Sequence, residues 1–348
     1  MVIISRILQS CTPVFFDAER RILHLQSVIL FTLLSVTSSF CKAQSVDYSV
    51  VSVPEEKGLE FRQITTANDY VCMPIVKRSA NNINWLSNRI IDILPNGTHI
   101  AYLSYRNNTS NIFLKELGKQ GSSVQRTNRS NVLDFSFSPD GRYLCFSEQR
   151  GKTNQIFQTN ALDGYVCRQI TNGNMDYSPV YSPDMKEIFF ARQEKNGVSI
   201  WSYNIANNFL ASYTNGMNPY PTANNKIFVC ARTNAAGKSE IWKINSENGV
   251  EECIIADQER SFTSPVISPN GQWIIFVGSS TLFAGNIKYL NTDIFVANID
   301  GTNMQQLTYH AADDLSPVWS KDGKYIYFIS QRGDSNGTAN IWRMTFNY

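Results

Sequence analysis

Histidine is scarce in this sequence, and the patterns that build common catalytic sites are missing. Three histidines occur in 348 residues. There is no His-Glu-x-x-His pattern, which would hold a zinc ion on a helix, and no Gly-x-Ser-x-Gly elbow, which would carry a nucleophilic serine. We therefore predict that the protein is not an enzyme and has no catalytic residue, no metal site and no cofactor.

A surplus of basic charge is also missing. The chain has 31 Lys and Arg against 29 Asp and Glu. Removing residues 1–43 takes away four basic and two acidic side chains, so the remainder is neutral. A nucleic-acid binder needs a basic surface to neutralise phosphates, and we exclude that class of partner.

Cysteines at metal-binding or redox spacing are absent as well. Five of the seven cysteines lie beyond residue 43, and none forms a Cys-x-x-Cys pair. Cys145 and Cys230 recur at the same place in apolar strands, so we interpret them as small buried hydrophobic residues. Nothing in the sequence requires a disulfide.

A long apolar run lies near the N-terminus. Arg20 and Arg21 precede the apolar residues 22–36, and Cys41-Lys42-Ala43 places small residues at both specificity positions of a signal peptidase. We predict a signal over residues 1–43, with an N-terminal extension, cleaved before Gln44, and a periplasmic or secreted protein. A lipoprotein anchored at Cys41 is the second interpretation. A retained membrane anchor is the third, because a spanning helix needs about 20 residues.

What the sequence has in abundance is a repeat, which is the first feature to seek in a chain of this length. One turn recurs about every 44 residues, and a degenerate copy occurs near Ala223-Asn224. The other copies are Leu94-Pro95-Asn96-Gly97, Ser138-Pro139-Asp140-Gly141, Ser182-Pro183-Asp184, Ser268-Pro269-Asn270-Gly271 and Ser320-Lys321-Asp322-Gly323. Asn-Gly and Asp-Gly supply the positive φ angles of a tight hairpin. The count predicts six units.

Each turn is followed by two strand signals. The first is an apolar run rich in β-branched and aromatic residues, and the second contains an isoleucine followed by an aromatic residue. The pairs are Ile112-Phe113, Ile156-Phe157, Ile200-Trp201, Ile241-Trp242, Ile294-Phe295 and Ile341-Trp342. We interpret them as packing between units, because a propeller buries its large side chains there.

The two ends of the chain complement each other. A fourth strand closes most units, as in Cys167–Thr171 and Gln305–Thr308, but the last unit stops after its third strand. Residues 61–65 repeat the missing strand. We predict an all-β fold, a six-bladed β-propeller of four-stranded antiparallel blades over residues 59–348, whose ring the N-terminal strand closes after a short leader at 44–58. Closure removes exposed sheet edges. We expect a monomer.

These motifs resemble the repeats of the TolB propeller family. The Ser-Pro-x-x-Ser-Pro-Asp-Gly turn occurs almost whole in Ser178–Asp184 and Ser264–Gly271, and a later element in Phe146–Gly151 and Phe328–Gly333. The resemblance covers residues 59–348 and implies a WD40-like propeller of the bacterial cell envelope. TolB carries an α/β domain ahead of its blades, whereas only residues 44–60 precede the first strand here.

Arginines and acidic residues occur in the same repeat. Arg106, Arg150, Arg192, Arg232 and Arg332 recur after the second strand, and we interpret them as repeated contacts with loop carbonyls or carboxylates rather than a ring around an anionic ligand. Single carboxylates, among them Asp176, Asp313 and Asp314, could bind a cation or act as acid–base groups. Because they stand in polar loops, we interpret them as solvated or turn-capping.

Length irregularities lie on one face of the predicted ring, at residues 68–84, 278–293 and 332–340. Insertions on a rigid scaffold are where binding usually occurs. We therefore predict a binding groove at the channel mouth on that face. Its residues are Tyr70, Met73, Asp176, Phe283, Tyr289, Tyr309, His310 and Asp314. The alternative is that the apolar members pack the long loops onto the propeller.

The predicted function is binding of a protein partner in the cell envelope. The alternative is a propeller that binds or cleaves a glycan, since oligogalacturonate lyases have similar repeats with a histidine-rich metal site. Only His99 and His310 lie beyond residue 43. A purely structural envelope component is the third hypothesis.

Overall fold

The computed structural model divides the chain into two units, Met1–Ser45 and Val46–Tyr348. The structure describes residues 48–73, 76–79, 82–85, 89–119, 121–164, 167–284 and 287–347. The predicted signal over residues 1–43 lies outside the described residues. In the described part, none of the helices is long and apolar enough to span a membrane.

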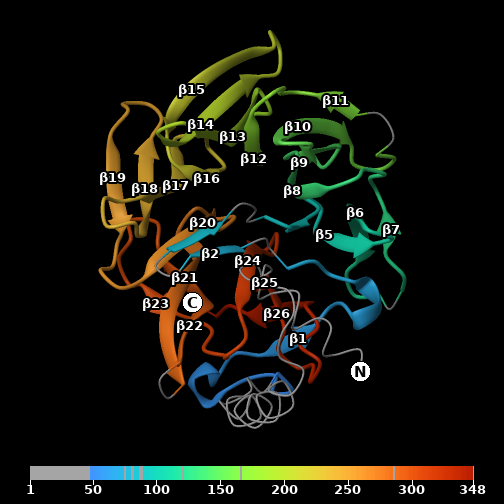
Figure 1. The fold of residues 1–348 in the computed structure, drawn as a ribbon, viewed down its shortest axis with the longest axis vertical. Coiled ribbons are helices and arrows are strands. Elements are labelled where there is room, and N and C mark those ends of the chain that lie inside the picture. Colours follow the sequence, from blue (N-terminus) through green and yellow to red (C-terminus); the bar gives the residue numbers. More distant parts are fainter. Residues whose placement is uncertain are drawn as a thin grey trace, which may run out of the picture. The chain divides into compact units, whose positions relative to one another are not determined.

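The second unit is built almost entirely of antiparallel strands in sets of four (Figure 1). The first strands of the sets are β4 (Ile91–Ile93), β8 (Val132–Phe137), β12 (Met175–Tyr181), β16 (Met217–Pro221), β20 (Ser261–Ile267) and β24 (Asp314–Trp319). The second strands are β5 (His99–Arg106), β9 (Tyr143–Arg150), β13 (Glu187–Glu194), β17 (Ile227–Thr233), β21 (Trp273–Ala284) and β25 (Tyr325–Ser330).

The third and fourth strands complete each set. The third strands are β6 (Thr109–Glu116), β10 (Thr153–Asn160), β14 (Gly197–Asn204), β18 (Ser239–Asn245), β22 (Ile287–Asn298) and β26 (Asn340–Thr345). The fourth strands are β7 (Val124–Gln125), β11 (Cys167–Gln169), β15 (Phe209–Asn215), β19 (Glu251–Ile255), β23 (Gln305–Gln306) and β1 (Phe61–Gln63). The sets are called sheets one to six, from the β4 sheet to the β24 sheet. A single parallel pair, Asn154 with Met175, joins sheets two and three.

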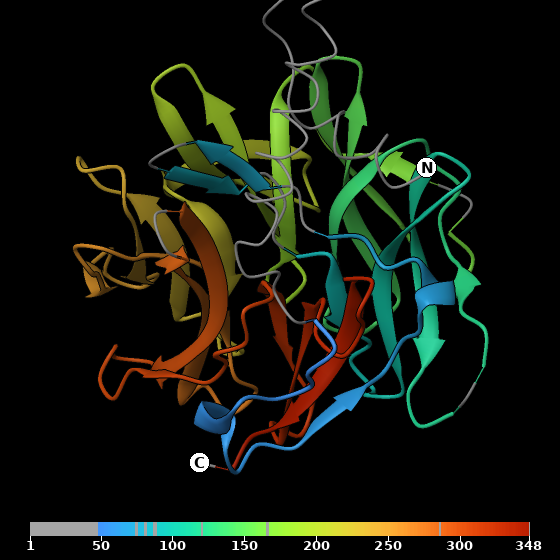
Figure 2. The same cartoon turned by 60° about the horizontal axis from the view of Figure 1, so that its bottom comes forward.

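Besides β1, four short elements precede β4 among the described residues. They are the 3-10 helices η1 (Pro54–Glu56) and η2 (Ala67–Asp69) and the antiparallel strands β2 (Val76–Ser79) and β3 (Asn82–Trp85). Strand β1 pairs with β26, with Arg62 opposite Arg343, so the sheet that contains the C-terminal strands takes its fourth strand from the N-terminal part of the unit (Figure 2). The predicted pairing of these two segments is confirmed.

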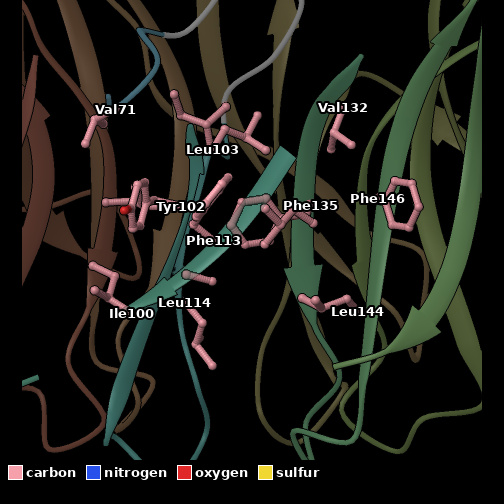
Figure 3. Packing of buried hydrophobic residues seen from close by; sticks show 14 of the residues in the cluster. Val71, Ile100, Tyr102, Leu103, Phe113, Leu114, Val132, Phe135, Leu144 and Phe146 are labelled. Carbon is pink, nitrogen blue, oxygen red and sulfur yellow. The ribbon is translucent and has the colours of Figure 1, made fainter. Parts of the chain in front are cut away.

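The first strands contact one another in chain order. Strand β4 contacts β8, β8 contacts β12, and the series continues through β16 and β20 to β24, which contacts β4. Large apolar side chains fill the space between neighbouring sheets. Between sheets one and two these include Tyr102, Phe113, Phe135 and Phe146, all buried in one cluster (Figure 3).

The isoleucines of the six predicted Ile-aromatic pairs all lie on third strands and have no exposed surface. Cys145 and Cys230 are buried, as the sequence predicts. All five cysteines among the described residues are free.

The recurring turns owe their shape to one hydrogen-bond pattern. In the second copy, the Ser138 hydroxyl donates to Asp140 at 2.6 Å, and Asp140 accepts from the Arg142 backbone at 3.0 Å. Gly141 follows with φ of 73°, a conformation that favours glycine. The degenerate copy keeps the pattern, since Thr222 donates to Asn224 and Asn225 adopts φ of 59°.

Candidate binding site at the Pro-Asx-Gly face

A hollow of about 370 Å³ lies at the ends of the first strands, on the face formed by the Pro-Asx-Gly turns. All six sheets contribute to its lining. The lining residues include Asp92, Leu94 and Pro95, then Phe137, Pro139, Tyr181, Pro183, Tyr220 and Ala223, and finally Ile267, Pro269, Trp319 and Lys321. We call it the funnel. A concave, mostly apolar site with a few polar groups is the usual form of a binding site.

The same backbone distortion recurs in four sheets at the inner end of the funnel. Ser178, Asn218, Ser264 and Ser316 have φ between 52° and 55°, and each precedes a proline. The ladder between first and second strand shifts register at each of these steps. Proline cannot donate to a ladder, so a bulge is where a strand tolerates it. The four prolines and Arg89 line a narrower cavity of about 20 Å³.

Arg89 is the charged side chain common to both cavities. Its guanidinium lies 4.7 Å from the centre of the Tyr220 ring, a cation–π contact between sheets one and four. Asp92, close by in β4, accepts backbone hydrogen bonds from Ile93 and Phe137, both at 2.9 Å. Burial raises the pKa of Asp92, and the positive charge of Arg89 opposes that rise. The floor of the funnel thus combines a cation with an acid of raised pKa.

Asp134 holds two sheets in register beside this floor. Its carboxylate accepts hydrogen bonds from the Ser147 hydroxyl and, at 2.9 Å, from the Ser178 backbone of sheet three. Burial raises the pKa of Asp134 to about 6, although both hydrogen bonds lower it. Asp134 therefore fixes the first of the strained Ser-Pro steps.

A second hollow of about 470 Å³ continues the funnel outward between the turns of sheets five and six. The two share Ser268, Pro269, Trp319 and Lys321. Its aromatic wall is ordered by edge contacts of Phe346 with Trp319 and Trp273, at 4.8 and 5.7 Å between ring centres. The two hollows together present lining residues from the turns of all six sheets.

Six of the eight residues of the predicted groove have described side chains. None of the six lines the funnel, and they differ in burial. Tyr70 and Tyr309 are 56% and 41% exposed. Tyr70 ends η2 with φ of 50° and lies 5.4 Å from the Arg106 guanidinium. Met73 is half-buried and packs against two apolar clusters, so it supports the core. The proposal that Tyr70 and Tyr309 contact a ligand remains a prediction.

Asp176, His310 and Asp314 are buried, and the interpretation of the two acids as solvated or turn-capping is wrong. Asp176 receives two hydrogen bonds from Arg192, at 2.7 and 3.0 Å. Asp314 accepts from Arg332 at 2.5 Å, and its pKa is raised to about 6 by burial, against the effect of that arginine. His310 Nδ1 accepts from the Ala312 backbone at 2.9 Å. The acids lie on first strands rather than in loops, facing arginines of the repeat.

The recurring arginines make the structural contacts that the sequence predicts. Arg106 donates to the Asp69 carbonyl and Arg232 to the Asn215 carbonyl. Arg150 donates to the Glu148 carboxylate, and Arg192 and Arg332 are paired with acids as described.

Phe283 and Tyr289 belong to an element that was expected to be a loop. Residues 278–284 and 287–293 instead continue β21 and β22, two paired antiparallel strands of twelve residues each, with Phe283 opposite Lys288 and Leu282 opposite Tyr289. The side chains of Phe283 and Tyr289 lie outside the described residues. An insertion of strand-forming residues lengthens the ladder because every second added pair gains two backbone hydrogen bonds.

The sequence prediction missed the funnel because it attributed the Pro-Asx-Gly face entirely to turn structure. The available signal was the convergence of six such turns on one channel end. Among the described residues, no three His, Cys, Asp or Glu side chains are grouped so that they could hold a metal ion.

The sequence profile described as PD40, TolB beta propeller domain, matches residues 92–283. This chain belongs to that family. It is 27% identical over 213 residues to the Tol-Pal system protein TolB of Francisella tularensis subsp. holarctica, a match that covers 60% of this chain and 47% of that protein. The chain thus spans about half the length of the curated relatives from Francisella.

Solved structures agree on the fold. A putative TolB from Agrobacterium tumefaciens superposes with a TM-score of 0.58 at 16% identity, over 77% of this chain and 95% of that one. An oligogalacturonate lyase from Vibrio parahaemolyticus superposes with a TM-score of 0.51 at 12% identity, over 83% of this chain and 97% of that one. At these identities the likeness concerns the β-propeller fold alone.

Proposed function

We propose that this protein is an exported, non-catalytic, six-bladed propeller that binds an extended segment of a protein partner in the bacterial cell envelope. Each four-stranded sheet is one blade. Two observations support a closed ring, namely the pairing of β1 with β26 and the contact of β24 with β4. The family membership and the name of its relatives support an envelope role.

The observation that carries the proposal is the shape and chemistry of the funnel. Side chains from all six blades meet there, and the hollow continues into the aromatic groove between blades five and six. Arg89, Asp92 and Lys321 supply charges of both signs in a lining that is about equally polar and apolar. Protein interfaces are enriched in aromatic residues and arginine at their buried centre, and the funnel offers Tyr220, Trp319 and Arg89.

The test is a blocking variant with a matched control. Ala223 is exposed and lines the funnel, so Ala223→Trp should fill the hollow without disturbing the core. Ala236 is equally exposed in the turn between β17 and β18, so Ala236→Trp adds the same side chain elsewhere. Tagged full-length protein and both variants are incubated with solubilised envelope proteins of the source organism, and a glycan array is run alongside.

The expected result is one saturable protein partner that the Ala223→Trp variant no longer captures and the Ala236→Trp variant still captures. If both variants still captured the partner and Tyr309→Ala did not, the binding site would be the groove predicted from the sequence. Glycan binding without a protein partner would favour the alternative function and require an assay for cleavage.

A further inference from the structure

Blade two carries a pocket in which two arginines share one carboxylate. Segments 128–130 and 148–151 enclose a hollow of about 370 Å³. Glu148 Oε2 accepts from Arg129 Nη2 at 2.6 Å, from Arg129 Nε at 3.2 Å and from Arg150 Nε at 3.0 Å. We call this the diarginine pocket. It lies at the Val132 end of β8, whereas the funnel is lined by the Phe137 end.

The pocket has an excess of positive charge and of hydrogen-bond donors over acceptors. Arg129 and Arg150 carry two charges against the single charge of Glu148. Within the described residues, neither Nη atom of Arg150 has a hydrogen-bond partner, and Nη1 of Arg129 has none. Both guanidiniums are held in place by the Phe157 ring, at 5.0 and 5.1 Å. Since the Arg150 side chain is 48% exposed, its free edge is accessible to a ligand.

The repeat shows what is missing at this position. Arg150 and Arg332 each stand nine residues after the turn glycine, at Gly141 and Gly323. Arg332 has no exposed surface and pairs with Asp314 of its first strand. Glu148 and Ser330 each stand two residues before their arginine. Val132 lies opposite Glu148, and Asp314 lies opposite Ser330, so Val132 occupies the position of Asp314. Blade two therefore has an apolar residue where blade six has the arginine's acid.

Blade six also shows how a carboxylate from outside the blade reaches this arginine. Glu56, on the segment before β1, accepts from Arg332 Nη1 at 3.2 Å and Nη2 at 3.1 Å. Arg332 Nη1 also donates to the Val51 carbonyl of the same segment at 3.0 Å. One arginine thus holds both a side-chain carboxylate and the backbone of an extended segment.

We propose that the diarginine pocket binds an acidic side chain on an extended segment of a partner protein, in the manner in which Arg332 holds Glu56. The ligand carboxylate accepts from the two Nη atoms of Arg150, a planar fork that matches a carboxylate. Arg129 supplies the second positive charge, and Glu148 keeps both guanidiniums oriented. This site goes beyond the funnel and lies at the opposite end of β8.

The test uses N-acetylated hexaglutamate as the probe and isothermal titration calorimetry on the full chain. We expect Arg150→Gln to weaken binding at least about tenfold, the factor that one charged hydrogen bond contributes. Arg150→Lys keeps the charge but loses the planar fork of donors. Its hexaglutamate affinity should lie between those of the wild type and Arg150→Gln. Arg142→Gln is the matched control, because Arg142 is an exposed arginine paired with Asp140 in a turn of the same blade.

Three outcomes would overturn the proposal. They are the absence of saturable hexaglutamate binding, equal weakening by Arg142→Gln, and tighter binding of trigalacturonate than of hexaglutamate at Arg150, which would make the ligand a uronate. Ala223→Trp in the funnel must leave hexaglutamate affinity unchanged. This last control separates the pocket from the funnel, so that failure at one site does not count against the other.

Discussion

Glu56 and Arg332 lie 276 residues apart in the sequence, and both side chains are completely buried in contact with each other. Glu56 also accepts from the Tyr309 and Val53 backbones, at 2.9 and 3.1 Å. Arg332 is in turn bound to Asp314. The segment before β1 is therefore attached to sheet six by a fully buried ion pair, next to the strand pairing of β1 with β26.

Breaking this ion pair should destabilise the propeller strongly. In Glu56→Gln the charge is lost while the shape is kept, and removing one partner of a buried pair typically costs about 3 kcal/mol. The loss of the Glu56 charge also lowers the pKa of Asp293 and Asp314, which offsets part of the cost. The measurement is urea unfolding at neutral pH.

The control for that experiment is a surface pair. Lys226 and Glu247 are 58% and 61% exposed, so Glu247→Gln should change the free energy of unfolding by no more than about 0.5 kcal/mol. Equal stability of Glu56→Gln and the wild type would contradict a structural role for the buried pair.

Asp293 predicts a particular dependence of stability on pH. Burial, together with the negative charge of Asp314, raises the pKa of Asp293 to about 9. The folded state therefore holds a proton that the unfolded state releases above its ordinary pKa of about 4. Stability that is fully present below pH 4 is lost as the pH rises towards 9, at up to about 1.4 kcal/mol per pH unit.

Asp293→Asn should remove this loss. We expect the variant to be more stable than the wild type at pH 8 and close to it at pH 5, measured by urea unfolding at both values. Asp163→Asn, at an exposed turn position, serves as the control and should follow the wild type. A variant with the same pH dependence as the wild type would show that Asp293 is not the group that titrates.

Gly278 should tolerate no side chain. It lies opposite Asp293 in the long hairpin, and a Cβ there would stand 2.7 Å from Phe295 Cδ2, closer still to Cε2, and 3.1 Å from Phe262. Both rings are buried, so Gly278→Ala should cost about 2 kcal/mol through overpacking. Gly121→Ala meets nothing within 4 Å and should be neutral in the same thermal melts. A neutral Gly278→Ala would mean that the two rings can move apart.

The sequence predicts the parts of this molecule that depend on local chemistry. The turn around Asp140-Gly141 and the buried isoleucines of the third strands follow from residue type and spacing, and they recur often enough to reveal the repeat. The pairing of β1 with β26 follows from the same logic, because the last unit lacks a fourth strand and residues 61–65 repeat one.

The parts that escape the sequence depend on neighbours distant in the chain. Asp176 and Asp314 look like loop acids until Arg192 and Arg332 are placed beside them. Residues 278–293 exceed the repeat length and so resemble a loop, although their strand-forming composition extends a hairpin. The funnel is assembled from turns of all six sheets, each of which has a sufficient structural explanation by itself, so nothing in the sequence points to that face. The groove predicted at the opposite end of the strands stays a prediction.

The most direct test of the account is site-specific photo-cross-linking in cells that express the full chain. A photoreactive amino acid replaces Lys321 in the funnel, Tyr309 on the opposite face, or Phe209, which is 63% exposed on the outer strand β15 and serves as the control. We predict a covalent adduct with one envelope protein from position 321, and none from 309 or 209. An adduct from position 309 with none from 321 would contradict the funnel as the binding site.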